Sequence, residues 1–294
     1  MSSDLFSVVG IRPEAPHPLP RRRRLEGFPW VSAVVLALIV FCCLFAELFM
    51  TKDPAYLDLS HSNTAPNAEF FFGTDGLGRD IFSGIWYGGR ISLAIGFLAT
   101  VISTLIAVVY GSVSGIAPQW LDTLLMRFAE IFLSVPGLLL VLFLQAVLGT
   151  ANVLTLSLVI GITGWAGMAK IVRTEVRQLR SSEYVVAAKA MGGGFFHILR
   201  RHLAPNFIAS IMFMVVMSVR SAIVSESTLS FLGMGLPLEV ISWGSMLSLA
   251  EKALMTQSWW IIVIPGAFLV ALLLCLTNLG NWLRKTANRK ESNL

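Results

Sequence analysis

Residues 91–121 read ISLAIGFLATVISTLIAVVYGSVSGIAPQWL, 31 positions without a charged side chain, and Pro118 is expected to mark the end of the helix. A helix needs about 20 apolar residues to cross the roughly 30 Å hydrocarbon core of a bilayer. Of the 294 residues, 55% are hydrophobic and only 13% are charged, whereas soluble domains average about 45–50% and about 25%. The composition predicts an all-α polytopic membrane protein. It excludes a disordered chain, a basic nucleic-acid binder and an ordinary cytosolic enzyme.

Further apolar runs on both sides of this segment bring the expected number of transmembrane helices to six. They cover 28–46, two short spans within 131–169 that turn at 149–152, 207–232, and part of 253–283. The third span is expected to begin before residue 131. We therefore predict one transmembrane domain at 28–284, preceded by a disordered basic tail at 1–27 and followed by a second tail at 285–294.

The distribution of Lys and Arg predicts the orientation, because cytoplasmic loops carry an excess of cations. Arginine occupies all of 21–24, seven cations lie in 170–206, and four more follow residue 283, whereas loop 51–90 holds three cations and five acids. With six spans, the three cation-rich regions share one side, so both termini are predicted to be cytoplasmic and loop 51–90 to be outside. The apolar run after 21–24 is longer than that of a signal peptide and no small-residue cleavage site follows it, which favours an uncleaved anchor.

Motifs for catalysis are missing from the sequence. It contains no GxxxxGK loop followed by Ser or Thr, no HExxH, no CxxC and no carboxylate pair at catalytic spacing. Its four histidines are scattered, and its three cysteines lie in apolar runs, as expected for small hydrophobic residues. We expect no catalytic residue, no metal site, no cofactor and no nucleic-acid partner.

The cation-rich segment at 170–206 has internal order. Lys170, Arg173, Arg177 and Arg180 recur at steps of three and four, with apolar residues opposite, so the fourth span is expected to continue as an amphipathic helix. A short helix at 183–192, a turn at Gly192 and its two following glycines, and a second short helix before Pro205 complete a compact knob. Its alanines would let a partner approach closely.

This knob follows the pattern E-x3-A-A-K-x2-G-x12-P, carried by Glu183, Ala187, Ala188, Lys189, Gly192 and Pro205. The pattern resembles the EAA loop of ABC importer permeases. Two more stretches are similar to the dipeptide/oligopeptide/nickel group, and to its second permease subunit in particular. They are the GTD motif in the outer loop (residues 73–80, with Gly73, Asp75, Gly78, Arg79 and Asp80) and the residues 226–235 and 242–247.

Three positions depart from that group. Gly84 stands where the group usually has Arg, Ala204 where Leu usually precedes the proline, and 238–241 reads LEVI where prolines are common. The first and third departures concern the outer loops, which bear on the choice of substrate.

The resemblance implies a type I importer core (MetI-like) in a bacterial inner membrane. It also implies a second homologous permease subunit, two cytoplasmic ATP-binding subunits, an extracytoplasmic solute-binding protein and surrounding lipid. The knob would then be the coupling helix, seated in a groove of an ATPase subunit. The implied cargo is a dipeptide or oligopeptide, with nickel, metal chelates or opines as alternatives.

Two function classes outside this family agree less well with the sequence. A secondary transporter that needs no ATPase predicts inverted repeats or broken helices, and the sequence contains no convincing internal repeat. A membrane anchor or sensor subunit would leave the knob without a purpose.

Two charged residues, Arg220 and Glu226, interrupt the fifth span. A charge at bilayer depth costs at least about 2.5 kcal/mol on insertion scales, so it usually faces a cavity or a protein partner. Six residues apart, the two lie about 240° around a helix and cannot form an i,i+4 pair. Arg220 is expected either to line the path and meet a peptide carboxylate or to pair with the other permease. Glu226 is expected to be structural or gating.

Smaller signals concern contacts between helices. Arg127 and Glu130 have the i,i+3 spacing of a pair on a helix surface. Gln145 and Asn278 are polar residues of the kind that join transmembrane helices, and Gly111-x3-Gly115 would allow two helices to pack closely.

Overall fold

The computed structural model describes residues 27–149, 151–180, 204–237 and 239–291. Apart from a three-residue 3-10 helix and one isolated bridge between Thr74 and Asp80, the regular structure of these residues is α-helical. The predicted all-helical fold is therefore confirmed. The helices run in the order α1 (Trp30–Leu44), α2 (Ala46–Phe49), η1 (Leu59–His61), α3 (Ile81–Ile116), α4 (Gln119–Ser134), α5 (Gly137–Leu148), α6 (Val153–Thr163), α7 (Ala166–Leu179), α10 (Ala204–Phe231), α11 (Trp243–Leu247), α12 (Ala250–Met255) and α13 (Trp260–Glu291).

Candidate membrane spans account for most of this helical structure. In the described chain three stretches are long and apolar enough to cross a bilayer, namely Ile81–Ile116, Ile211–Phe231 and Trp260–Thr286. Two bent pairs, α4 with α5 (89°) and α6 with α7 (48°), each pass the same test as one span. Helix α1 is apolar but has only 15 residues. The structure thus supports three to five spans, and the expected total of six stays a prediction.

The second span begins earlier than expected, at residue 81 instead of 91. Its start is marked by Asp80, whose side chain caps α3 by accepting a hydrogen bond from Ser83 N. The helix ends at Ile116 because Pro118 follows, and residues 119–121 belong to the next helix, α4. The predicted start of this span at residue 91 was therefore wrong, whereas its predicted end at Pro118 is confirmed.

The expected turn between the third and fourth spans is confirmed at its described residues. Helix α5 ends at Leu148, and Gly149 follows with a φ of +83°, a value that suits glycine. Asn152 then starts α6 through a capping box with Thr155. The bend between α4 and α5 lies at Val135-Pro136, where proline excludes a continuous helix.

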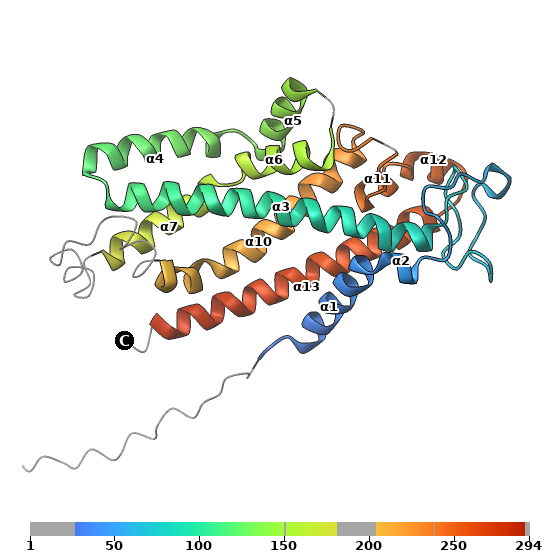
Figure 1. Ribbon diagram of the computed structural model, residues 1–294, viewed down its shortest axis with the longest axis horizontal. Coiled ribbons are helices and arrows are strands. Elements are labelled where there is room, and N and C mark those ends of the chain that lie inside the picture. Colours follow the sequence, from blue (N-terminus) through green and yellow to red (C-terminus); the bar gives the residue numbers. More distant parts are fainter. Residues whose placement is uncertain (1–26, 150, 181–203, 238, 292–294) are drawn as a thin grey trace, which may run out of the picture.

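Helix α3 runs through the centre of the bundle, with α4, α5 and α6 on one side of it and α13 and α1 on the other (Figure 1). It packs closely against a neighbouring helix at the glycines of Gly111-x3-Gly115. A Cβ added at Gly111 would lie 2.5 Å from Ala169 O, and one at Gly115 would lie 2.8 Å from Val176 Cγ1. The predicted close packing is confirmed, and α7 is the partner helix.

The two polar residues expected to join helices behave differently. Asn278 in α13 donates from Nδ2 to Ser32 Oγ in α1 at 3.0 Å, so that expectation is confirmed. Gln145 donates to Gly149 O at 3.3 Å, just beyond the end of its own helix, so for this residue the expectation stays a prediction. The surface pair is confirmed, with 2.9 Å between Arg127 Nη1 and Glu130 Oε2.

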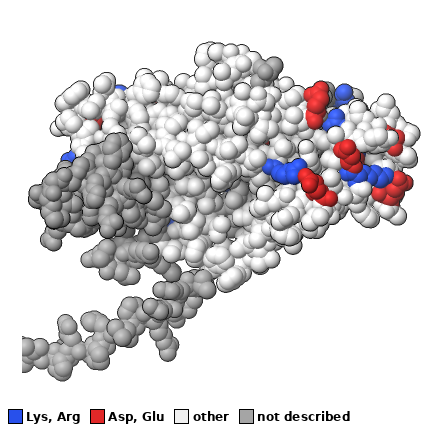
Figure 2. Space-filling model, viewed as in Figure 1, with Lys and Arg blue, Asp and Glu red and all other residues white. Residues whose placement is uncertain are grey.

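Charge is distributed unevenly over the surface. On the face in view, Lys, Arg, Asp and Glu gather at the end of the bundle that carries the loop between α2 and α3 (Figure 2). The long middle part of that face is almost free of charge, as a bilayer requires.

Candidate functional site

The knob expected at 183–205 lies almost wholly outside the described residues. This applies to Glu183, Ala187, Ala188, Lys189 and Gly192. Pro205 is described only in its backbone, which lies in the first turn of α10. The sites that can be built from geometry are therefore the GTD motif, the environment of Glu226 and that of Arg220.

The GTD motif forms a tight turn that leads into the N-terminus of α3. Asp75 Oδ1 accepts hydrogen bonds from the backbone of Leu77 at 2.8 Å and of Arg79 at 2.9 Å. The Asp75 side chain is buried, and this burial raises its pKa above the usual value although the two amides lower it. The turn therefore depends on a carboxyl group that points inward.

Asp80 connects this turn to the start of the α2–α3 loop. Its Oδ2 atom accepts from Ser83 Oγ at 2.6 Å and from Thr51 Oγ1 at 2.9 Å. Ser83 Oγ in turn accepts from the backbone N–H of Thr51 at 3.1 Å. The N-terminus of α3 and Thr51, the second residue after α2, are thereby held together.

The glycines of the motif are required by geometry. Gly78 has a φ of +75°, and a Cβ at this position would lie only 1.8 Å from Asp58 O. Gly73 has the same φ, and a Cβ there would lie 2.6 Å from Thr64 O. Any other residue at either position strains the backbone and displaces a neighbouring segment of the loop.

We expect Gly78→Ala to lower the thermal unfolding temperature of the purified protein and to expose the α2–α3 loop to protease. The physical reasons are the left-handed backbone and the contact with Asp58. Gly76→Ala is the matched control, because its Cβ would come no closer than 3.7 Å to any atom, Asn63 Oδ1 being the nearest. Equal protease resistance in the two variants would contradict the prediction.

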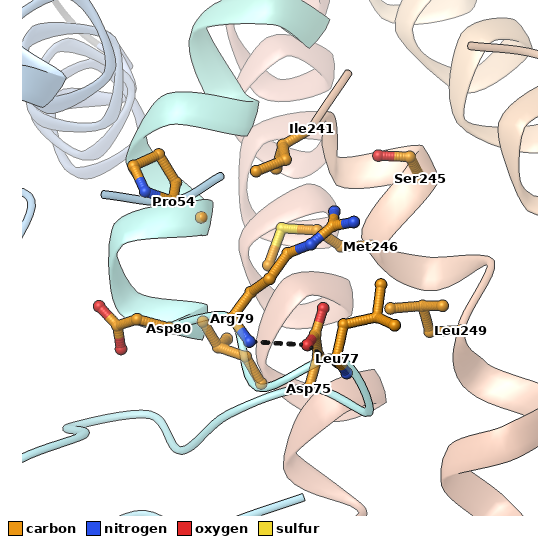
Figure 3. A pocket seen from close by; sticks show the side chains of 11 residues that line it. Pro54, Asp75, Leu77, Arg79, Asp80, Ile241, Ser245, Met246 and Leu249 are labelled. Atoms are coloured by element: carbon orange, nitrogen blue, oxygen red, sulfur yellow. Dashed lines mark hydrogen bonds between the residues drawn. The ribbon is translucent and has the colours of Figure 1, made fainter. Parts of the chain in front are cut away.

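The GTD motif meets residues from the far end of the chain in a small pocket (Figure 3). The Arg79 side chain extends past Met246 toward Ile241 and Ser245 (Figure 3). The free volume is about 20 Å³, room for about one water molecule. The complete lining is Pro54, Asp75, Leu77, Arg79, Asp80, Ile81, Gly84, Ile241, Ser245, Met246 and Leu249.

Gly84, one of the departures from the family pattern, lies in the wall of this pocket. A Cβ added there would lie 3.1 Å from Met246 Cε, so an arginine would require the neighbouring methionine to move. The departure at 84 therefore matches the close packing of α3 against α11.

Glu226 is the centre of a buried polar cluster. Its side chain is 0% exposed, and its carboxylate accepts from Ser92 Oγ in α3 at 3.0 Å, from Ser230 Oγ in α10 at 3.1 Å and from Ser242 Oγ at 2.7 Å. Ser92 Oγ also accepts from the backbone N–H of Trp243 at 3.2 Å. The carboxylate thus ties α3, α10 and the start of α11 to one point. Among the described residues no ion pair joins it to Arg220, in agreement with their spacing.

Arg220 lies near the middle of the apolar stretch Ile211–Phe231 and is exposed. Beside it on α10, Ser218 and Ser221 line a recess of about 60 Å³ together with residues of α3 and the α6–α7 break. The other lining residues are Ala99, Thr100, Ser103, Ile160, Gly164 and Ala222. The Thr100 side chain is buried, and its hydroxyl has no hydrogen-bond partner in the described part of the chain.

Sequence reasoning singled out Glu226 and Arg220 but missed their surroundings. The serines of both clusters are common residues in ordinary positions, and only the packing of α3 against α10 brings them together. For Glu226 a usable signal existed, since Glu226 and Ser242 each begin a stretch, 226–235 and 242–247, that resembles the same permease group.

Several known proteins are similar to this chain in sequence. Residues 107–289 match the family model described as "Binding-protein-dependent transport system inner membrane component". The chain is 37% identical over 269 residues to the oligopeptide transport system permease protein OppC of Bacillus subtilis, covering 92% of this chain and 88% of the relative. It is 38% identical over 270 residues to the dipeptide transport system permease protein DppC of the same organism, covering 92% and 84%. With OppC of Haemophilus influenzae the identity is 35% over 262 residues, covering 88% and 84%.

Proposed function

The chain belongs to the family of binding-protein-dependent transport system inner membrane components, and from this premise we propose that it is the permease subunit of an ATP-driven importer of dipeptides or oligopeptides. It is a multi-pass protein of the inner membrane. The observation that carries the proposal is the match, over 92% of the chain in each case, to relatives named for oligopeptide and for dipeptide transport.

In this proposal the chain forms half of a translocation path and contains no ATPase site of its own. Its partners are a second homologous permease, two cytoplasmic ATP-binding subunits and an extracytoplasmic solute-binding protein. The residues that couple it to an ATPase subunit are Glu183, Ala187, Ala188, Lys189 and Gly192, between α7 and α10 in the sequence, and Pro205, in the first turn of α10. Closure of the ATPases on nucleotide would move the coupling segments of the two permeases together and switch the path between its two openings. Reversing a 1:99 equilibrium in this way requires about 5.5 kcal/mol of differential binding.

The test is reconstitution in proteoliposomes with and without the partner subunits. The complete assembly is expected to import labelled dipeptide or oligopeptide with ATP inside the compartment that corresponds to the cytoplasm. The isolated chain is expected to neither hydrolyse ATP nor transport solute. Transport by the isolated chain would overturn the proposal, and import of nickel or a metal chelate in place of peptide would correct its substrate.

We further propose six transmembrane spans, with α1 as the first, the two bent pairs as the third and fourth, and both termini in the cytoplasm. The cation-rich segments at 21–24, 170–206 and beyond residue 283 support this orientation. Helix α1 also lies along α13, joined to it by the Asn278–Ser32 hydrogen bond.

This topology predicts opposite accessibility at two exposed positions. The side chain of Glu69 is 64% exposed and that of Arg127 is 77% exposed. A membrane-impermeant maleimide added to intact spheroplasts is expected to label Glu69→Cys fully and Arg127→Cys only after permeabilisation. The native cysteines described as buried provide the unmodified background. Labelling of both variants in intact spheroplasts would contradict the arrangement.

Arg220 is assigned to the translocation path. A charge in the middle of an apolar span is tolerated where it faces a cavity or a protein partner, and Ser218 and Ser221, close to Arg220 in the sequence of α10, line a recess with hydroxyl groups. A guanidinium in this place would recognise a carboxylate by paired hydrogen bonds. The free C-terminal carboxylate of a peptide is the matching group.

We expect Arg220→Gln to raise the KM for peptides with a free C-terminus about tenfold, the loss of one charge-assisted contact, and to leave C-terminally amidated peptides unaffected. Arg220→Lys keeps the charge, and its KM for these peptides is expected to lie between that of the wild type and that of Arg220→Gln. Uptake competition between the free and amidated forms measures the difference. If Arg220→Gln instead separates the two permeases on purification, the side chain pairs with the other subunit and the assignment is wrong.

A further inference from the structure

The cations on and directly after α7 contact groups of α3 and α4. Lys170 Nζ lies 3.3 Å from Glu130 Oε1 in α4, and Arg177 Nη1 lies 3.4 Å from Asp122 Oδ2 at the start of the same helix. Arg180, at the end of α7, donates from Nη1 to Gly115 O in α3 at 3.1 Å. The sequence predicted the periodicity of these cations, and the structure adds a specific partner for each.

Asp122 is the centre of these contacts. Its side chain is buried, and both of its oxygens accept from Arg173, one from Nε and the other from Nη2. Oδ1 also accepts from Ser114 Oγ in α3 at 2.6 Å. A forked arginine–carboxylate pair fixes orientation as well as distance, so three helices meet at one carboxylate with a defined geometry.

The apolar packing behind this cluster is equally close. Val172 and Val176 of α7 are both 0% exposed, and α7 rests on Gly111 and Gly115 of α3, where even a Cβ would clash. Apolar contact alone is non-directional and allows a helix to rotate or slide. The ion cluster removes that freedom, so the end of α3, the start of α4 and all of α7 form one block.

This block is the support of the coupling segment, because α7 ends at Leu179 and the segment follows directly. We propose that Asp122 is a positioning residue that carries the motion of the coupling segment into α4, and through the bend at Pro136 into α5. The inference rests on the proposed function of residues 183–205. It connects the coupling segment to the third span, which α4 and α5 form in the proposed topology.

The test uses the complete transporter in proteoliposomes, with peptide uptake and ATP hydrolysis measured on the same sample. Asp122→Asn is expected to keep the ATPase subunits bound, to lower uptake at least tenfold and to raise the ATP consumed per peptide at least tenfold. Asp122→Glu, which keeps the charge, should recover part of the uptake. Arg127→Gln is the matched control, since it removes a charge of α4 whose described partner, Glu130, lies on the same helix. Its uptake is expected to stay within twofold of the wild type.

The double variant Asp122→Arg with Arg173→Asp exchanges the two charges and is a second test. It should restore at least a third of the peptide uptake per ATP that Asp122→Asn loses. If Asp122→Asn fails to insert, Arg180→Gln, which removes only the bond to Gly115, is expected to reduce uptake about threefold at unchanged ATPase binding. Coupled transport by these variants at the level of Arg127→Gln would overturn the inference. Failure of the wild-type complex to hydrolyse ATP would instead count against the proposed function.

Discussion

Gly192→Pro is expected to abolish peptide uptake while the protein still inserts into the membrane. Gly192 is the first of three glycines between the two short helices predicted in the coupling segment. A glycine permits the sharp turn there, whereas proline fixes φ near −65° and removes the backbone donor. A segment that must transmit about 5.5 kcal/mol cannot do so if its two helices no longer have a fixed relation.

Glu183→Arg is expected to give the same loss for an electrostatic reason. Glu183 begins the first short helix of the segment, where a carboxylate favours the helix dipole and a cation opposes it. The measurement for both variants is uptake of labelled peptide, normalised to the amount of permease in the membrane fraction. Gly167→Ala serves as control, because a Cβ at that glycine would meet no atom within 4 Å. Normal uptake by Gly192→Pro or Glu183→Arg would contradict the assignment of the coupling segment.

Glu226→Leu is expected to produce the second large effect, a loss of both stability and transport. Leucine has a similar size but leaves the hydroxyls of Ser92, Ser230 and Ser242 without their buried acceptor. Each unsatisfied buried group costs about 1–3 kcal/mol, so the sum is large against a typical stability of about 5–15 kcal/mol. The contact between α3, α10 and α11 would open.

Glu226→Gln separates this explanation from a requirement for charge. The amide keeps one acceptor and the shape of the side chain, and the serine hydroxyls can also accept from its NH₂ group. We expect the glutamine variant to keep most of the thermal stability and uptake, and the leucine variant to lose at least tenfold in uptake with a clearly lower unfolding temperature. A leucine variant as stable as the wild type would show that the cluster has no structural role. A glutamine variant that is stable but inactive would indicate that the carboxylate acts as a gate.

Several features were predictable because they depend on neighbouring residues alone. The apolar runs specify where helices can cross a bilayer, and Gly149 with Asn152 specifies the turn between two of them. The spacing of Gly111 and Gly115 indicated a close helix contact, and the structure identifies α7 as the helix that makes it.

Other features could not be read in this way. The early start of α3 at Ile81 depends on Asp80, Ser83 and Thr51 meeting across the loop. The role of Asp122 is one of these, although it is the sole acid between residues 81 and 129. Its partner Arg173 lies 51 positions further along the chain, and only the packing of α4 against α7 brings the two together.

The sequence by itself determined that this protein is a helical membrane permease, because hydropathy, cation distribution and motif spacing are properties of the chain before it folds. Only the tertiary structure decided which groups work together. It placed Arg79 beside Ile241, Glu226 among serines of three segments, and Asp122 under the arginines of α7. The physical reason is that a buried charge is stabilised by whichever donors the packing of the helices brings within about 3 Å, and helix packing is set by side-chain shape over the whole bundle.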